Sequence, residues 1–187
     1  MLIMNSSSSL FCRGLRFLER LSCRAVLKLF LRDRISIGKG VAVSHGATFH
    51  ILGSLTIGDH CRIEDGCFLE SRGKNGISIG NRVYINRNVS IYAHKSVRIG
   101  DDCMFGPNVS IYDHDHAVSD GVICKTEFIC DSVVIEDGCW IGAGSIILQG
   151  SVIEKNCILG ANTVIKGHIP ANSTVIDKRE KRITRHE

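Results

Sequence analysis

Residues 77–111, ISIGNRVYINRNVSIYAHKSVRIGDDCMFGPNVSI, carry the pattern that specifies the architecture. Large apolar residues recur six positions apart in sets of three, such as Ile79, Ile85 and Ile91, and a small or β-branched residue stands two positions before each. Alternation this short predicts strands of about three residues, too short to pair with their sequence neighbours through hairpins. Each strand must therefore pair with the equivalent strand of the next repeat.

The same pattern extends in both directions and predicts a parallel β-helix of triangular section with about six coils, an all-β domain over residues 35–176. Glycine often follows the large residue, as expected at a tight corner or where coils approach closely. The large positions are Ile37, Val43, Phe49, Ile57, Ile63, Leu69, Ile79, Ile85, Ile91, Ile99, Phe105, Ile111, Ile135, Ile141, Ile147, Ile153, Leu159 and Ile165. Five cysteines of the small column are expected to be packing thiols: Cys61, Cys67, Cys103, Cys139 and Cys157.

Composition places the chain among compact single-domain proteins. It has 187 residues with 44% hydrophobic and 22% charged content and two prolines, which excludes disordered and collagen-like classes. Nine cysteines form an odd count with no CxxC pair, so a disulfide framework is not expected and a reducing cytoplasm is favoured. The net charge of +4 comes mainly from the first 34 residues, which argues against a general nucleic-acid surface.

The two ends of the chain differ from the repeats. In the N-terminal segment, residues 1–34, basic residues recur every three or four positions over 9–33 and predict an amphipathic helix that is too charged to span a bilayer. That helix either caps the open end of the prism or contacts anionic lipid at the inner face of the membrane. Residues 177–187 form a charged tail.

One insertion stands out from the repeat. Residues 112–132 separate the fourth set from the fifth and are expected to form a long loop that projects from the prism. A loop of this length inside a compact repeat is usually functional or disordered.

Residues 35–176 resemble the hexapeptide-repeat acyltransferases, especially the O-acetyltransferases that act on maltose, galactosides and surface polysaccharides. The resemblance rests on the repeat together with IGNRVYIN, RIGDDCMFGPNVSIYDHDH, CWIGAG and GANTVIKGHIP in that order. It implies a left-handed winding, a homotrimer, acetyl-CoA as co-substrate, a sugar or glycan acceptor and no required metal. The implied activity is acetyl transfer in surface polysaccharide, O-antigen or capsule biosynthesis.

The resemblance also implies roles for individual polar residues. His116 matches the general base that deprotonates the acceptor hydroxyl, a task suited to imidazole near neutral pH. Either Asp113, Asp115 or a backbone carbonyl would orient it. Asn86 and His114 are expected contacts of the acceptor sugar. The amide of Asn86 suits a sugar hydroxyl because it both donates and accepts hydrogen bonds. The alternatives are a solvated loop histidine and a stacked corner asparagine.

The coenzyme is expected along one edge of the prism. Trp140 lies between two inward residues and must face outward, against the coenzyme or another subunit. The other expected contacts are small or basic residues: Gly106, Gly142, Ala143, Gly160, Ala161, Lys166 and Lys181. Two rival classes remain open. One is a zinc enzyme of the γ carbonic anhydrase type that uses His94, His114 and His116, and the other is a non-catalytic β-helix scaffold.

Overall fold

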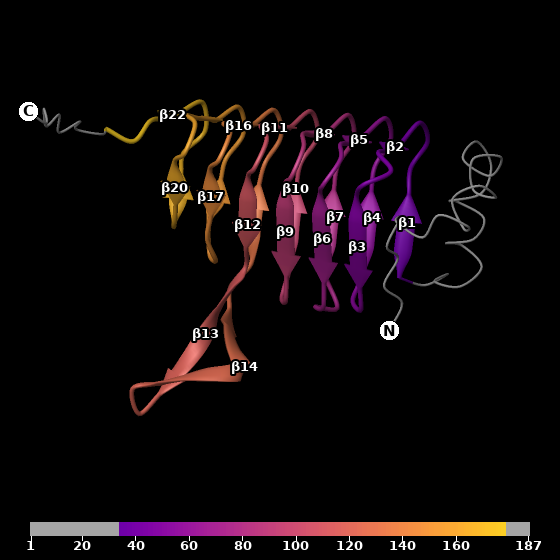
Figure 1. Cartoon of the computed structure of the whole chain (residues 1–187). Helices are drawn as coiled ribbons and strands as arrows, with labels where there is room; N and C mark the ends of the chain where they lie inside the picture. Colours follow the sequence, from indigo (N-terminus) through magenta and orange to yellow (C-terminus); the bar gives the residue numbers. More distant parts are fainter. Residues whose placement is uncertain (1–33, 179–187) are drawn as a thin grey trace, which may run out of the picture.

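The computed structural model describes residues 34–178, and these form stacked parallel coils with three flat faces (Figure 1). The first face consists of β1 (Ile35–Ile37), β4 (Leu55–Ile57), β7 (Ile77–Ile79), β10 (Val97–Ile99), β15 (Val133–Ile135), β18 (Val152–Ile153) and β21 (His168–Ile169). The second consists of β2 (Ala42–Val43), β5 (Arg62–Ile63), β8 (Tyr84–Ile85), β11 (Met104–Phe105), β16 (Trp140–Ile141), β19 (Ile158–Leu159) and β22 (Thr174–Val175). The third consists of β3 (Thr48–Ile51), β6 (Phe68–Ser71), β9 (Ser90–Ala93), β12 (Ser110–Tyr112), β17 (Ile146–Ile147) and β20 (Val164–Ile165).

The predicted β-helix is confirmed, with one difference in its length. The sequence pattern predicts about six coils, whereas β21 and β22 add two sides of a seventh. The six-residue spacing breaks after Ile165, and the next inward residues, Ile169 and Val175, are only partly buried against the core. The strand pairing is parallel throughout the three faces, and the left-handed winding stays an expectation from the resemblance.

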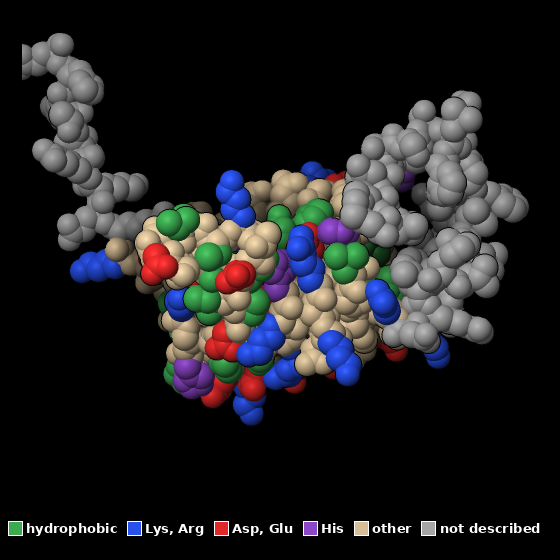
Figure 2. Space-filling model, turned by 90° about the horizontal axis from the view of Figure 1, so that it is seen from below, with side chains coloured by type: hydrophobic (Ala, Val, Ile, Leu, Met, Phe, Trp, Pro, Cys, Tyr) green, Lys and Arg blue, Asp and Glu red, His purple; other side chains and the backbone are tan. Residues whose placement is uncertain are grey.

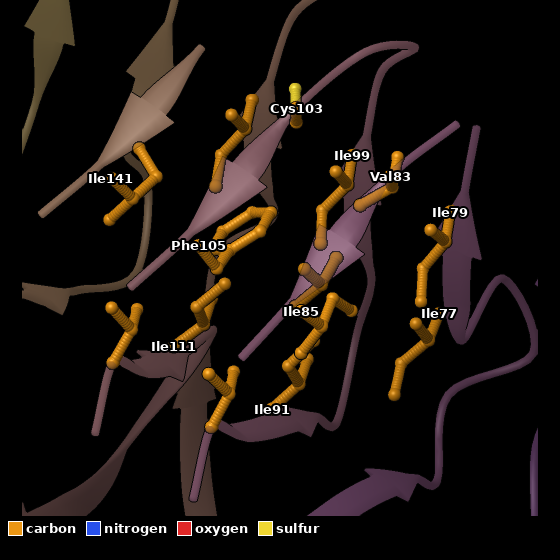
Figure 3. Packing of buried hydrophobic residues seen from close by; sticks show 14 of the residues in the cluster. Ile77, Ile79, Val83, Ile85, Ile91, Ile99, Cys103, Phe105, Ile111 and Ile141 are labelled. Carbon is orange, nitrogen blue, oxygen red and sulfur yellow. The ribbon is translucent and has the colours of Figure 1, made fainter. Parts of the chain in front are cut away.

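The core is the stack of inward side chains predicted from the spacing. Figure 3 shows isoleucines of successive coils packing on one another around Phe105, which is fully buried. The five cysteines of the small column are buried as expected. Their thiols donate to backbone carbonyls one coil further along, as Cys103 does to Glu136 at 3.1 Å, so each thiol satisfies a corner oxygen. Among the large positions predicted to point inward, Val43 in the first coil is the one that is exposed.

Two corners of the prism carry most of the site residues predicted from the sequence. The corner between the second and third faces, called here the glycine edge, contains Gly106, Gly142 and Gly160. A Cβ on Gly142 would lie 2.6 Å from the backbone nitrogen of Ala161, and neither Gly106 nor Gly142 has a positive φ. Close approach between coils, rather than unusual backbone geometry, is therefore the reason for glycine there.

The corner at the end of the third face is called here the hairpin edge. From it projects the long insertion, which is a two-stranded antiparallel hairpin of β13 (His114–Ser119) and β14 (Val122–Cys130) rather than an irregular loop (Figure 1). The expected helix over 9–33 and most of the charged tail lie outside the described residues. Within residues 34–178 no helix is long and apolar enough to span a bilayer.

Candidate active site

The predicted site residues fall on two different edges of the prism. Asn86, the glycines and both alanines follow second-face strands and lie on the glycine edge, with Trp140 beside it on β16. His114, His116 and Lys166 follow third-face strands and lie at the hairpin edge. The third face separates the two groups, so one chain does not bring them together. Lys181 lies outside the described residues.

The glycine edge is open over three consecutive coils. Its residue pairs are Gly106–Pro107, Gly142–Ala143 and Gly160–Ala161, and larger polar residues, Asn86–Arg87, stand one coil earlier. Coil packing explains Gly106 and Gly142, but Ala143 is half-buried and Ala161 is exposed. Their methyl side chains leave room along this edge that a larger side chain would occupy. The small residues predicted from the sequence therefore follow one another along this edge, and their role in coenzyme binding stays a prediction.

Asn86 stands at the start of this open stretch. Its side-chain oxygen accepts the backbone N–H of Arg87 at 2.8 Å. Its amide nitrogen makes no hydrogen bond among residues 34–178, so a donor remains for an external acceptor group. The expected role of Asn86 as an acceptor contact stays a prediction.

Trp140 faces outward, as the repeat register predicts, and is 48% exposed. It pairs in register with Met104 on one side and Ile158 on the other, which are 42% and 40% exposed. These three side chains form an apolar stripe on the second face, next to the glycine edge. A ligand or a second subunit can cover such a stripe.

His116 is exposed on β13, and its ring has a defined orientation. Its Nδ1 lies 2.9 Å from the carbonyl oxygen of Cys124 on β14. Because a carbonyl oxygen only accepts, Nδ1 carries a proton, and in the neutral ring Nε2 keeps its lone pair. The strand register shifts between His116 and Val118, and Cys124 lies in the irregular stretch opposite. Such an irregularity removes a carbonyl from the ladder and makes it available to a side chain.

The two aspartates beside His116 have other partners. Asp113 is buried and accepts the backbone N–H groups of His94 and Lys95 at 2.8 and 2.7 Å. Asp115 accepts the side-chain amide of Gln149 at 2.5 Å and lies 3.9 Å from Nζ of Lys166. Of the orienting groups considered from the sequence, the backbone carbonyl is the one in contact with His116.

A cluster of aromatic rings lies at the root of the hairpin. Its three histidines were grouped from the sequence only as possible zinc ligands, and neither their stacking nor Phe128 was predicted. His94, just after β9, stacks on His114 with ring centroids 3.5 Å apart and planes within 3°. Phe128 meets both rings in a T-shaped arrangement, at 4.5 and 5.3 Å, and lies 4.8 Å from the ring of His116. The coil repeat places residues 94 and 114 at equivalent positions of adjacent coils. Periodicity could therefore indicate that the two positions are neighbours, but not that the two imidazole rings stack.

Glu70 anchors this cluster from the coil before. It accepts hydrogen bonds from His50 at 2.9 Å and Arg72 at 2.8 Å, and His94 lies at 3.4 Å. Burial by itself would raise the pKa of Glu70, but the hydrogen bonds from His50 and Arg72 outweigh it and lower that pKa. Burial lowers the pKa of His94, and the neighbouring His114 lowers it further. Near neutral pH the cluster therefore pairs a carboxylate with a neutral His94.

The histidine geometry does not match a shared zinc ion. The lone pairs of imidazole lie in the ring plane, and two parallel rings 3.5 Å apart cannot direct both onto one metal. Among the residues that the structure describes, no group of three His, Cys, Asp or Glu side chains is arranged to hold a metal ion.

Seen from the side of the hairpin, the surface shows basic, acidic, histidine and apolar side chains interspersed with one another, without one large patch of a single charge (Figure 2).

Two models of known families match parts of the prism. Residues 132–167 match the family described as bacterial transferase hexapeptide, with six repeats, and residues 61–93 and 96–119 match the hexapeptide repeat of succinyl-transferase. These ranges coincide with the coils described above. The chain therefore contains hexapeptide repeats of the bacterial transferase type over these residues.

Individual relatives are similar to parts of the chain. A galactoside O-acetyltransferase of Lactococcus lactis is 34% identical over 62% of this chain, and the match spans 56% of that enzyme. A putative lipopolysaccharide biosynthesis O-acetyl transferase of Escherichia coli is 29% identical over 66% of this chain and 67% of its own length. The fold is similar to an N-acyltransferase from Bacillus cereus in complex with dTDP and 3-hydroxybutyryl-CoA, with a TM-score of 0.71, 24% identity and coverage of 93% and 86%.

Proposed function

We propose that this protein is a CoA-dependent O-acyltransferase that transfers acetyl from acetyl-CoA to a sugar hydroxyl. The observation that carries the proposal is the orientation of His116, whose Nδ1 is held by the Cys124 carbonyl so that Nε2 faces outward as a base. Imidazole accepts a proton near neutral pH, which suits deprotonation of an acceptor hydroxyl. A non-catalytic scaffold has no need of an oriented histidine.

The proposed reaction is a single displacement. Nε2 of His116 takes the hydroxyl proton while the hydroxyl oxygen attacks the thioester carbonyl of acetyl-CoA. The carbon–sulfur bond then breaks, and the departing CoA sulfur takes the proton back from the imidazolium. The products are the acetyl ester and free CoA thiol. Positioning of the two substrates supplies much of the rate in such a transfer.

The glycine edge is the proposed coenzyme site. Gly106, Gly142, Ala143, Gly160 and Ala161 leave a surface free of large side chains along three coils, and backbone groups can approach a ligand there. Trp140 borders it with an exposed ring. Lys166 lies on the hairpin edge and is proposed to meet the phosphates of a coenzyme bound to a neighbouring copy, and Lys181 is a second proposed phosphate contact. The structural similarity to an acyltransferase that was solved with a CoA thioester supports this site.

The proposed assembly is a homotrimer in which each site forms between two copies. Within one chain the third face separates His116 from the glycine edge, so a complete site needs the hairpin edge of one copy against the glycine edge of another. Closed symmetry repeats this contact at each interface. The apolar stripe of Met104, Trp140 and Ile158 is a surface that such an interface would bury.

The proposed acceptor is a sugar of a surface glycan precursor, with Asn86 and His114 as its contacts. The names of the relatives support this class, since one acetylates galactosides and another is assigned to lipopolysaccharide biosynthesis. We place the reaction in the cytoplasm, at the inner face of the membrane if the basic segment 9–33 binds anionic lipid. A variant without residues 1–33 that still binds anionic vesicles as well as the full chain would contradict the membrane contact.

Calorimetric titration with acetyl-CoA tests the coenzyme site. We expect binding by the full chain, and weaker binding by Trp140→Ala. Transfer of radiolabelled acetyl to galactosides and nucleotide-linked sugars then tests the reaction. If metal-stripped protein does not bind acetyl-CoA, the proposed function is wrong.

A further inference from the structure

The β13–β14 hairpin is held against the prism on two sides. On the side of the later coils, Asp115 is held by Gln149 and Lys166. On the side of the preceding coil, His94 of the prism stacks on His114 at the root of the hairpin. A two-stranded hairpin is only marginally stable in water by itself, so these contacts determine where its residues lie.

The histidine side is the firmer of the two supports. The side chains of His94 and His114 are 8% and 14% exposed, and buried Asp113 lies 3.1 Å from Nδ1 of His114. On the other side, Asp115 and Lys166 are more than half exposed. Exposed ion pairs contribute little because water and salt screen them. The buried stack therefore limits the movement of the hairpin root most strongly.

A short path of contacts leads from this stack to His116. Alternate residues of a strand point to the same face, so His114 and His116 share one face of β13. Phe128 is the cross-strand partner of His116 and touches the rings of His94, His114 and His116. A change at His94 thus reaches His116 through one intervening ring.

We propose that His94 is a positioning residue for His116, acting through its stack on His114 and its contact with Phe128. The inference rests on the proposed function only for its effect on catalysis; the orientation of the His116 ring can be measured separately. His94 does not touch the reacting atoms. It acts by keeping the hairpin root, and with it the hydrogen bond between His116 and Cys124, in one arrangement.

Ring stacking, rather than charge, is the property that this role requires. The charged and titratable groups that face His94 are Glu70, Arg72, Asp113 and His114. The contact with Glu70 is long at 3.4 Å, and Glu70 keeps His50 and Arg72 as partners without it. A phenylalanine at position 94 keeps a flat ring in the stack and removes only this contact, whereas alanine removes the ring.

The test compares His94→Ala with His94→Phe in the full chain, with His45→Ala as the control. His45 is an exposed histidine of the first coil, three coils before the coil that contains Gly106, and it belongs neither to the hairpin nor to the proposed coenzyme contacts. Nitrogen NMR of histidine-labelled protein reports the tautomer of each ring, and His116→Gln identifies the signal of His116. Steady-state kinetics and acetyl-CoA binding are measured on the same proteins.

We expect a single tautomer with the proton on Nδ1 of His116 in the wild type, in His94→Phe and in His45→Ala, and a mixture in His94→Ala. We also expect kcat of His94→Ala to fall about 10- to 100-fold with unchanged acetyl-CoA affinity. A wild-type His116 signal in His94→Ala, or failure of His94→Phe to restore it, would overturn the proposal. If wild type binds no acetyl-CoA, the proposed function fails, while the NMR comparison still decides the positioning role.

Discussion

His116 and Cys124 are joined across the hairpin by a hydrogen bond of 2.9 Å between Nδ1 and the backbone carbonyl oxygen. The partner is a main-chain group of β14, although two carboxylates stand within three residues of His116 in the sequence. A carbonyl fixes the tautomer as well as a carboxylate does, but it adds no negative charge beside the imidazole. The ring of His116, the proposed base, is thus held in place by the fold of the hairpin.

Loss of the imidazole is expected to abolish most of the activity without affecting coenzyme binding. For His116→Ala we expect kcat to fall about 10²- to 10⁴-fold, the usual contribution of a general base. The acetyl-CoA dissociation constant, measured by calorimetry, should stay within about twofold of wild type because the proposed role of His116 is to deprotonate the acceptor hydroxyl and not to hold the coenzyme. Retention of more than about a tenth of kcat would contradict the assignment.

Filling the glycine edge is expected to weaken coenzyme binding. Ala161→Leu places a larger side chain on the exposed part of the edge, where it would occupy space proposed for the coenzyme. Acetyl-CoA affinity should fall about tenfold or more, which corresponds to about 1.4 kcal/mol. Thr56→Leu is the matched control, because Thr56 is exposed on the first face. Equal affinities of the two variants would place the coenzyme elsewhere.

Mixing two inactive variants tests whether the site forms between copies. In His116→Ala the proposed base is missing, and in Ala161→Leu the proposed coenzyme edge is filled. A site that takes its hairpin edge and its glycine edge from different copies can still be intact in a mixed oligomer. After unfolding and refolding of an equal mixture, about a quarter of the sites should be intact by random assembly. Activity no higher than the sum of the separate variants would show that each site lies within one chain.

Acid is expected to loosen the hairpin root before the prism. Burial, and then the neighbouring His114, lower the pKa of His94 from its usual 6.5, so the unfolded chain binds that proton more readily. The stability linked to His94 is therefore present above about pH 6.5 and is lost as the pH falls through its lowered folded-state pKa. Glu70, whose pKa is also lowered, contributes stability that is present above its usual 4.5 and is lost as the pH falls further.

Hydrogen exchange measures this loosening directly. Amides of β13 and β14 should lose protection between about pH 7.5 and pH 5, after correction for the intrinsic exchange rate, while those of β9 and β12 stay protected. His94→Phe should remove the upper part of this pH dependence because it removes the titrating group. A hairpin whose corrected protection is constant over this range would contradict the prediction.

The core column is expected to control stability. Phe105 is fully buried among isoleucines of neighbouring coils (Figure 3), and Phe105→Ala should lower the free energy of unfolding by about 3–5 kcal/mol through lost contacts and the remaining cavity. Arg98→Ala changes an exposed residue and should stay within about 0.5 kcal/mol. Urea denaturation of both variants checks the difference, and similar midpoints would argue against this core.

The repeat was predictable from the sequence because it is periodic. A side chain every second residue and a corner every sixth specify which residues point inward, so the faces, the buried cysteines and the outward direction of Trp140 were all predictable from spacing. The seventh coil was not, because its inward residues, Ile169 and Val175, come after a break in the six-residue interval. Periodicity therefore predicts the triangular cross-section of the prism better than the number of its coils.

The candidate site depended on tertiary structure in three respects. Spacing placed His116 on the insertion, but only strand pairing with an irregular register brings the Cys124 carbonyl to its ring. The stack of His94 on His114 joins residues of different coils. The separation of His116 from the glycine edge results from which corner each residue occupies. Local sequence patterns specify whether each side chain points inward or outward. Contacts between coils depend instead on how each coil stacks on the next, and this stacking is determined by the whole fold.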